Sequence, residues 1–220
     1  MSQRLVGGND VGFDPLVTDC VYATGWGKGP GCETRDQSAL DQLMGFLTTG
    51  IPSGCYPKPG VTVSGGTPPP ACGPVESLSQ LYASIVQTTP GAKLLVVGYP
   101  HLFGSSFRKG SCKVGAIGSA YHFYVSQGDA VWLNSEADTL DGIIKQAASS
   151  AAAATGADIE FVDPRTVFNT HSLCDTSKTW INPLLFKPAT AWPPVTDKSE
   201  SFHPNVTGQN ALATLIEGYA

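Results

Sequence analysis

Lys93-Leu94-Leu95-Val96-Val97-Gly98-Tyr99-Pro100 is a continuous apolar run of strand length. A parallel strand covered on both faces has this composition, whereas a strand with one wet face alternates apolar and polar residues. Asp158-Ile159-Glu160-Phe161-Val162-Asp163 is a second segment that we predict to be a strand. A third segment, Arg4-Leu5-Val6-Gly7, is typical of the end of a strand, because it runs directly into a Gly-Gly-Asn-Asp turn.

Helical periodicity separates these predicted strands. Apolar residues recur at helical spacing over residues 35–47, 75–86 and 129–155, and again from about Val206. Gly50-Ile51-Pro52 ends the first of these helices, and Gly156 ends the third. The alternation predicts an α/β fold in which helices cover both faces of a parallel sheet. Functional residues in such a fold gather at the carboxyl ends of the strands.

The composition predicts one globular domain over residues 1–220 and excludes several classes of function. A net charge of −5 without a run of basic residues argues against nucleic acid as a partner. No apolar run reaches the roughly 20 residues of a transmembrane segment. We expect a monomer that uses neither a cofactor nor a metal. Residues 50–74 are rich in proline and glycine, and we predict that they form an insertion loop without regular structure.

The cysteine count predicts an oxidising compartment. The six cysteines are an even set without a C-x-x-C pair, which favours disulfides over a metal or redox site, although six reduced core cysteines remain an alternative. Fifteen pairings are possible. The segment Met1–Val6 does not have the pattern of a signal peptide. We therefore expect a secreted protein whose export signal lies upstream of residue 1.

His203 is the strongest candidate for a catalytic residue. It lies in a loop just before the last predicted helix, three residues after Glu200 and six residues after Asp197. A histidine held on such a loop can act as a general base that a carboxylate orients. The alternative is a histidine that only caps the helix beside a solvated Glu200.

Gly7-Gly8-Asn9-Asp10 also has two interpretations. As a structural element it is a tight turn, in which glycine supplies a positive φ and Asn or Asp caps a helix. As a functional element, the Asn9 amide and a glycine backbone N–H, which we assign to Gly7, stabilise an oxyanion during acyl transfer.

Taken together, these segments resemble the SGNH (GDSL-type) ester hydrolases. Gly7-Gly8-Asn9-Asp10-Val11-Gly12-Phe13 and Ser201-Phe202-His203-Pro204-Asn205 are similar to two of the family's defining blocks, in the family's order. Val97–Phe103 resembles its central strand and turn, and residues 168–182 are similar to a segment of its secreted microbial and fungal members. The resemblance covers nearly the whole chain apart from the insertion.

The resemblance implies a three-layer α/β/α, flavodoxin-like fold with a parallel sheet, and a role for each matching residue. Asn9 would be an oxyanion-hole donor, His203 the base and Glu200 the aligned acidic partner. Because the family usually has Asp at that position, Glu200, Asp197 or a backbone carbonyl of the loop remain open as the group that orients His203. The implied disulfides are Cys20–Cys32, Cys112–Cys174 and Cys55–Cys72.

One family block does not occur in the sequence. The family carries its nucleophilic serine in a Gly-Asp-Ser block upstream of the Asn-bearing block, and the chain contains neither Gly-Asp-Ser nor a G-x-S-x-G elbow. We therefore expect an N-terminally truncated serine ester hydrolase that lacks the first strands of the fold. Its substrate would be a small-molecule, lipid or polysaccharide ester. The alternatives are a lipid- or glycan-binding pseudoenzyme and an unrelated flavodoxin-like nucleotide binder, which the lack of a glycine-rich phosphate loop disfavours.

Overall fold

The computed structural model describes residues 12–23, 31–60, 69–186 and 200–219. The elements, in chain order, are α1 (Phe13–Asp19), β1 (Val21–Ala23), α2 (Cys32–Thr49), β2 (Cys55–Tyr56), β3 (Ala71–Cys72), α3 (Leu78–Thr88), β4 (Leu94–Val97), β5 (Ser111–Ile117), β6 (Tyr121–Ser126), α4 (Gln127–Thr155), β7 (Ile159–Val162), α5 (Arg165–Phe168) and α6 (Val206–Glu217).

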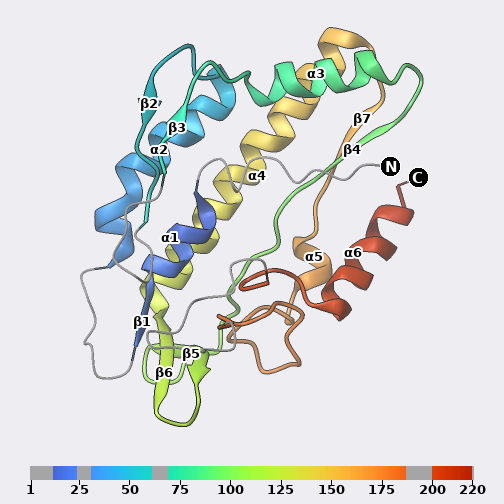
Figure 1. Ribbon diagram of the computed structural model, residues 1–220. Coiled ribbons are helices and arrows are strands. Elements are labelled where there is room, and N and C mark those ends of the chain that lie inside the picture. The colour runs from blue at the N-terminus through green and yellow to red at the C-terminus, as the bar shows by residue number, and fades with distance from the viewer. Residues whose placement is uncertain (1–11, 24–30, 61–68, 187–199, 220) are drawn as a thin grey trace.

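The two apolar segments that suggested an α/β fold are neighbouring parallel strands. β4 pairs with β7 in the register Leu94↔Ile159 to Val97↔Val162, as the sequence predicts. Both strands run toward the end of the molecule that carries α5, the start of α6 and the β5–β6 hairpin (Figure 1). The predicted strand at residues 4–7 lies outside the described residues. The described part of the chain is therefore a mixed α/β structure with one parallel pair.

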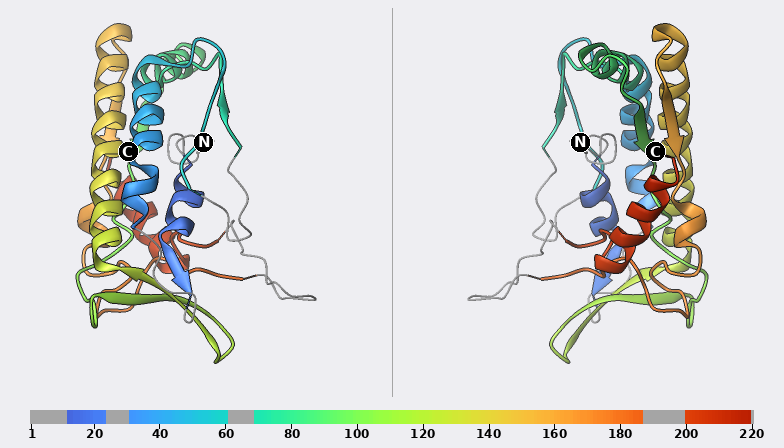
Figure 2. Two further views of the ribbon diagram at one scale, coloured as in Figure 1. Left: turned by 90° about the vertical axis from the view of Figure 1, so that its left-hand side faces the viewer. Right: turned by 90° about the vertical axis from the view of Figure 1, so that its right-hand side faces the viewer.

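A three-stranded antiparallel sheet, which the sequence analysis did not predict, lies at the end of the molecule toward which this pair runs (Figure 1). Its strand order is β1-β6-β5, and the β5–β6 hairpin projects from one end of the molecule (Figure 2). A register shift between Lys113 and Gly115 gives β5 a bulge. Gly115 also forms a parallel bridge to Leu184, which brings the hairpin against the segment that precedes the His203 loop.

Side-chain caps set the starts of two helices. Ser77 Oγ accepts a hydrogen bond from Gln80 N–H, and the Gln80 side chain accepts one from Ser77 N–H, so α3 begins at Leu78 rather than at Val75. The Ser126 side chain caps α4 by accepting from Asp129 N–H. Asp129 Oδ1 in turn accepts from Cys32 N–H at the start of α2, so a single carboxylate links the first turns of two helices.

The insertion at residues 50–74 is partly regular, contrary to the prediction. β2 and β3 pair antiparallel, with Cys55 opposite Cys72, because the disulfide between these residues holds the two segments together. The other implied disulfides, Cys20–Cys32 and Cys112–Cys174, are confirmed as well. All six cysteines are therefore oxidised.

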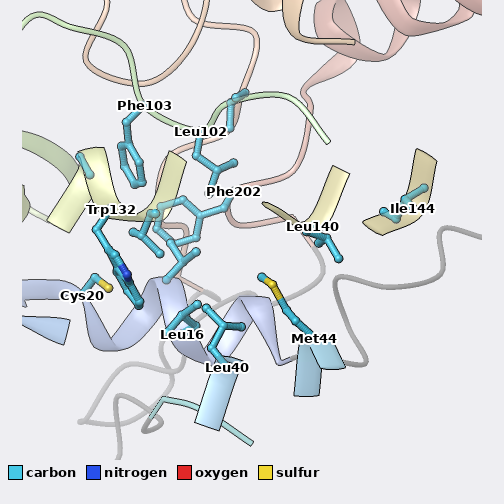
Figure 3. Close-up of a cluster of buried hydrophobic side chains, with 14 of the residues drawn as sticks. Leu16, Cys20, Leu40, Met44, Leu102, Phe103, Trp132, Leu140, Ile144 and Phe202 are labelled. Atoms are coloured by element: carbon cyan, nitrogen blue, oxygen red, sulfur yellow. The ribbon is translucent and has the colours of Figure 1, made fainter. Parts of the chain in front are cut away.

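The hydrophobic core lies between α1, α2, α4 and the loops that follow β4. Figure 3 shows Leu16, Leu40, Met44, Trp132 and Leu140 directed toward one another from these helices. Leu212, Leu215 and Ile216 of α6, which periodicity predicts to face inward, are only half-buried. Within the described ranges, no helix combines the length and the apolar character that crossing a bilayer requires.

Candidate functional site

His203 is presented by a tight turn of residues 200–203. The turn is closed by the His203 N–H, which donates to the Glu200 carbonyl oxygen at 3.2 Å. The His203 side chain is exposed, and its Nδ1 lies 2.9 Å from the carbonyl oxygen of Ser201. A carbonyl oxygen can only accept a hydrogen bond, so Nδ1 must carry the proton in this arrangement. In the neutral ring, Nε2 is then the unprotonated nitrogen, the form that a general base requires.

Phe202 holds this turn against the core. Its φ is 61°, in the left-handed region that bulky residues rarely adopt, as expected for the third position of a turn that normally takes glycine. Its side chain is only 9% exposed and lies beside Leu102 and Phe103 (Figure 3). Burial of the ring offsets the backbone strain, and the reversal leaves the next side chain, His203, directed outward.

A neighbouring strand-like segment, residues 179–185, clamps the His203 loop. Asn182 N–H donates to the His203 carbonyl at 2.9 Å, and Phe202 N–H donates to the Asn182 carbonyl at 3.2 Å. The Asn182 side-chain amide donates to the Glu200 carbonyl at 3.2 Å. An antiparallel bridge between Ile181 and Pro204 continues this pairing. The loop is therefore fixed by backbone pairing as a strand is, although it is not part of a sheet.

The start of α6 is attached to the same segment. The Asn205 side-chain oxygen accepts from Thr207 and Gly208 N–H, which caps the helix, and its amide donates to the Thr179 carbonyl. Asn205 N–H donates to the Trp180 carbonyl at 2.8 Å. A Cβ at Gly208 would lie 2.4 Å from that same carbonyl oxygen, so glycine is required for this close approach. The helix that follows His203 is thus docked at its first turn.

Of the other predicted site residues, only Glu200 is among the residues that the structure describes. The remaining three, Gly7, Asn9 and Asp197, lie outside them. Glu200 is exposed, and its backbone carbonyl accepts the bonds that close the turn and tie it to Asn182. Of the three groups that remained open for His203, the one found at Nδ1 within the described residues is a backbone carbonyl, that of Ser201.

The remaining histidines make local structural contacts. His122 Nε2 lies 3.2 Å from the Ser119 carbonyl oxygen within the β5–β6 hairpin. The His171 ring stacks on Trp180 with centroids 3.8 Å apart and planes 3° from parallel, and its Nδ1 contacts the Lys178 carbonyl. His101 Nε2 contacts Asp138 Oδ1 at 2.8 Å.

A charged cluster that the sequence analysis did not identify lies where β4 and β7 end. Arg165 contacts both Asp163 and Asp138, and it lies 3.8 Å from Asp141. Burial raises the pKa of Asp141 to about 6, although its Oδ1 accepts a hydrogen bond from Tyr99 N–H. Burial would also raise the pKa of Asp138, but hydrogen bonds from His101 and Arg165 outweigh burial and lower this pKa.

The arrangement of this cluster indicates a structural role. Asp138 and Asp141 are one helical turn apart on α4, and Arg165 lies just after β7, so the ion pairs fasten this helix to the ends of the parallel pair. In the sequence, the two aspartates are three residues apart within a predicted helix, and this spacing places them on the same helix face. Across the described ranges, no three His, Cys, Asp or Glu side chains are grouped closely enough to hold a metal ion.

Comparison with known proteins finds similarity to lipolytic enzymes of Streptomyces. Lipase 1 of Streptomyces coelicolor is 24% identical over 205 residues, which are 93% of this chain and 54% of the relative. This chain therefore spans about half the length of that protein. The extracellular lipase of Streptomyces rimosus superposes with a TM-score of 0.54 at 21% identity, over 98% of this chain and 67% of the neighbour. Phospholipase A1 of Streptomyces albidoflavus gives 0.53 at 19% identity, over 98% and 66%.

No family model matches the chain. The relative nevertheless aligns over almost the whole of it, and both structural neighbours share its fold. The block around His203 and the three disulfides are also those that the resemblance implies. In sequence the chain is therefore similar to a Streptomyces lipase, and in fold it is similar to a lipase and a phospholipase of the same genus.

Proposed function

We propose that the chain is the base-bearing part of a secreted SGNH-type carboxylic ester hydrolase, with His203 as the general base. The observation that carries this proposal is the hydrogen bond from His203 Nδ1 to the Ser201 carbonyl, which leaves Nε2 as the proton acceptor on an exposed side chain. We propose that this carbonyl, rather than the carboxylate of Glu200 or Asp197, orients the imidazole.

In this mechanism Nε2 takes the proton of a serine hydroxyl while the hydroxyl oxygen bonds to the ester carbonyl carbon. The imidazolium then returns the proton to the alcohol oxygen as the carbon–oxygen bond of the ester breaks. Water repeats the sequence on the acyl-enzyme, which releases the acid and restores the hydroxyl. Asn9 and the backbone N–H of Gly7 would donate to the oxyanion. No metal or cofactor is part of this proposal.

The nucleophile is the one part of this mechanism that the 220 residues do not match, because they contain no Gly-Asp-Ser block. We propose that a segment upstream of residue 1 supplies it, together with further strands of a parallel sheet in a three-layer fold. Without that serine, turnover should be orders of magnitude slower, since an oxyanion hole and a base alone give only residual hydrolysis. Three disulfides support secretion, because such bonds persist in oxidising compartments.

The same missing block favours a second candidate, a pseudoenzyme that binds a lipid or glycan without turnover. Hydrolysis of p-nitrophenyl esters by the protein from the upstream-extended reading frame decides between the two. The ester hydrolase predicts activity that falls at least about 100-fold with His203→Ala and is kept with His122→Ala, a histidine of the hairpin. Binding of a vesicle or glycan without any hydrolysis by the extended protein would instead favour the pseudoenzyme.

A further inference from the structure

The Ser201 side chain is almost fully buried, and its contacts are unusual for a serine in a surface loop. It is 2% exposed. Its Oγ accepts a hydrogen bond from Leu185 N–H at 2.9 Å and lies 3.3 Å from the Leu185 carbonyl oxygen, to which it donates. One hydroxyl thus satisfies both backbone groups of a single residue, as a paired strand would.

The same residue carries the carbonyl that meets His203. The Ser201 oxygen accepts from His203 Nδ1, while the Ser201 side chain is bonded to Leu185 on the clamp segment. The Oγ bonds hold the Ser201 Cα, at which the peptide that carries this carbonyl begins, and the N–H of the same peptide, that of Phe202, donates to the Asn182 carbonyl. The clamp continues to Leu184, whose N–H donates to the Val114 carbonyl in β5 at 2.7 Å. The chain of contacts therefore runs from a strand of the antiparallel sheet to the imidazole.

We infer that Ser201 is a positioning residue, whose hydroxyl locks the carbonyl that sets the tautomer and orientation of His203. This inference rests on the proposed role of His203 as the base and deepens it. A carboxylate that orients a catalytic histidine is held by its own hydrogen bonds, and here a serine hydroxyl does the same for a neutral carbonyl. Asn182 assists, because its amide fixes the Glu200 carbonyl in the same turn.

The test measures the tautomer of His203 directly. It needs no turnover, so it can be carried out on a chain without ester hydrolase activity, and its result is independent of that activity. Long-range proton–nitrogen NMR of the ¹⁵N-labelled chain distinguishes a protonated from an unprotonated ring nitrogen, and His203→Ala assigns the signals. We expect the unmutated chain to carry the proton on Nδ1. In Ser201→Ala the ratio of the Nδ1–H to the Nε2–H form should fall about fivefold, the effect of losing one ordinary hydrogen bond. Ser201→Thr, which keeps the hydroxyl, should restore most of the ratio.

Ser77→Ala is the matched control. Ser77 is also a buried serine, 4% exposed, and its hydroxyl caps α3, which lies at the opposite end of the molecule from the His203 loop (Figure 1). This variant should lose thermal stability and leave the His203 signals unchanged. A Ser201→Ala protein that is folded and keeps the wild-type tautomer ratio would overturn the inference.

A second measurement covers the case in which Ser201→Ala does not fold. In the unmutated chain, the Leu185 N–H and the His203 Nδ1–H should exchange with solvent through the same opening, with protection that declines in parallel as urea is added. Loss of the Nδ1–H while Leu185 N–H stays protected would show that the two groups open independently, and the inference would then be wrong.

Discussion

The Nδ1 atom of His203 and the carbonyl oxygen of Ser201, two residues earlier in the chain, lie 2.9 Å apart. The turn that brings them together depends on Phe202, the residue between them, which has a positive φ and a buried ring. Backbone geometry, core packing and the protonation pattern of the imidazole are therefore linked within three consecutive residues.

Replacing Phe202 should separate the cost of the strained backbone from the value of the buried ring. Phe202→Ala should destabilise the chain by about 3–5 kcal/mol, because it empties a core position and keeps a side chain at φ 61°. Phe202→Gly should be about 1 kcal/mol more stable than Phe202→Ala, because glycine adopts this conformation without strain. Urea unfolding measures the free energy of unfolding of both variants. A glycine variant that is less stable than the alanine variant would contradict the conclusion that the backbone at residue 202 is strained.

Two helix glycines should respond in opposite directions to alanine. Gly142, in α4, has open space where a Cβ would be, so Gly142→Ala should stabilise the chain by about 0.5–1 kcal/mol through helix propensity. Gly208→Ala should destabilise it, because the new Cβ would collide with the Trp180 carbonyl. Thermal unfolding of both variants tests this. Equal gains in midpoint temperature would mean that α6 does not approach residue 180 so closely.

The free energy of unfolding should fall as the pH rises through about 6. The folded-state pKa of Asp141 is about 6, against 3.8 ordinarily, so the folded chain holds a proton that the unfolded chain releases. This stabilisation is complete below pH 3.8 and is lost as the pH passes about 6. The difference of about two pH units corresponds to up to about 3 kcal/mol. Burial raises the pKa of Asp36 to about 6 as well, so it adds a contribution of the same sign.

Asp141→Asn should remove one of these two contributions and flatten the stability profile between pH 4 and 7. The matched control is Asp158→Asn, which replaces an exposed carboxylate at the edge of the same parallel pair and should leave the slope unchanged. Urea unfolding at several pH values gives the profile. An unchanged slope in Asp141→Asn would show that this carboxyl does not hold a proton near pH 6.

Much of the helical structure could be predicted from the sequence, because an amphipathic helix leaves a period that one chain segment carries alone. α2, α4 and α6 fall where periodicity predicts them. Helix starts were less accurate, because the caps Ser77 and Ser126 lie outside the apolar pattern. The β5–β6 hairpin breaks the alternation of strands and helices on which the predicted fold rests, so this pattern does not reveal it, although Tyr121–Val125 is rich in aromatic residues.

The candidate site was only half predictable, for a different reason. An imidazole is visible in a sequence, so His203 could be identified from its loop and neighbours. The group that orients it could not, because every residue has a carbonyl and only the turn decides which one meets Nδ1. Likewise, the hydroxyl of Ser201 acquires its role through Leu185, sixteen residues earlier, which local spacing does not reveal.

The central claim is that His203 is the base and that a backbone carbonyl, not an acidic side chain, orients it. The most direct measurement is kcat for a p-nitrophenyl ester, determined for the protein from the upstream-extended reading frame with His203→Ala and Glu200→Gln side by side. We predict that kcat falls at least about 100-fold in His203→Ala and changes less than about threefold in Glu200→Gln, because an exposed carboxylate contributes little. Unchanged activity in His203→Ala, or an equally large loss in Glu200→Gln, would contradict the claim.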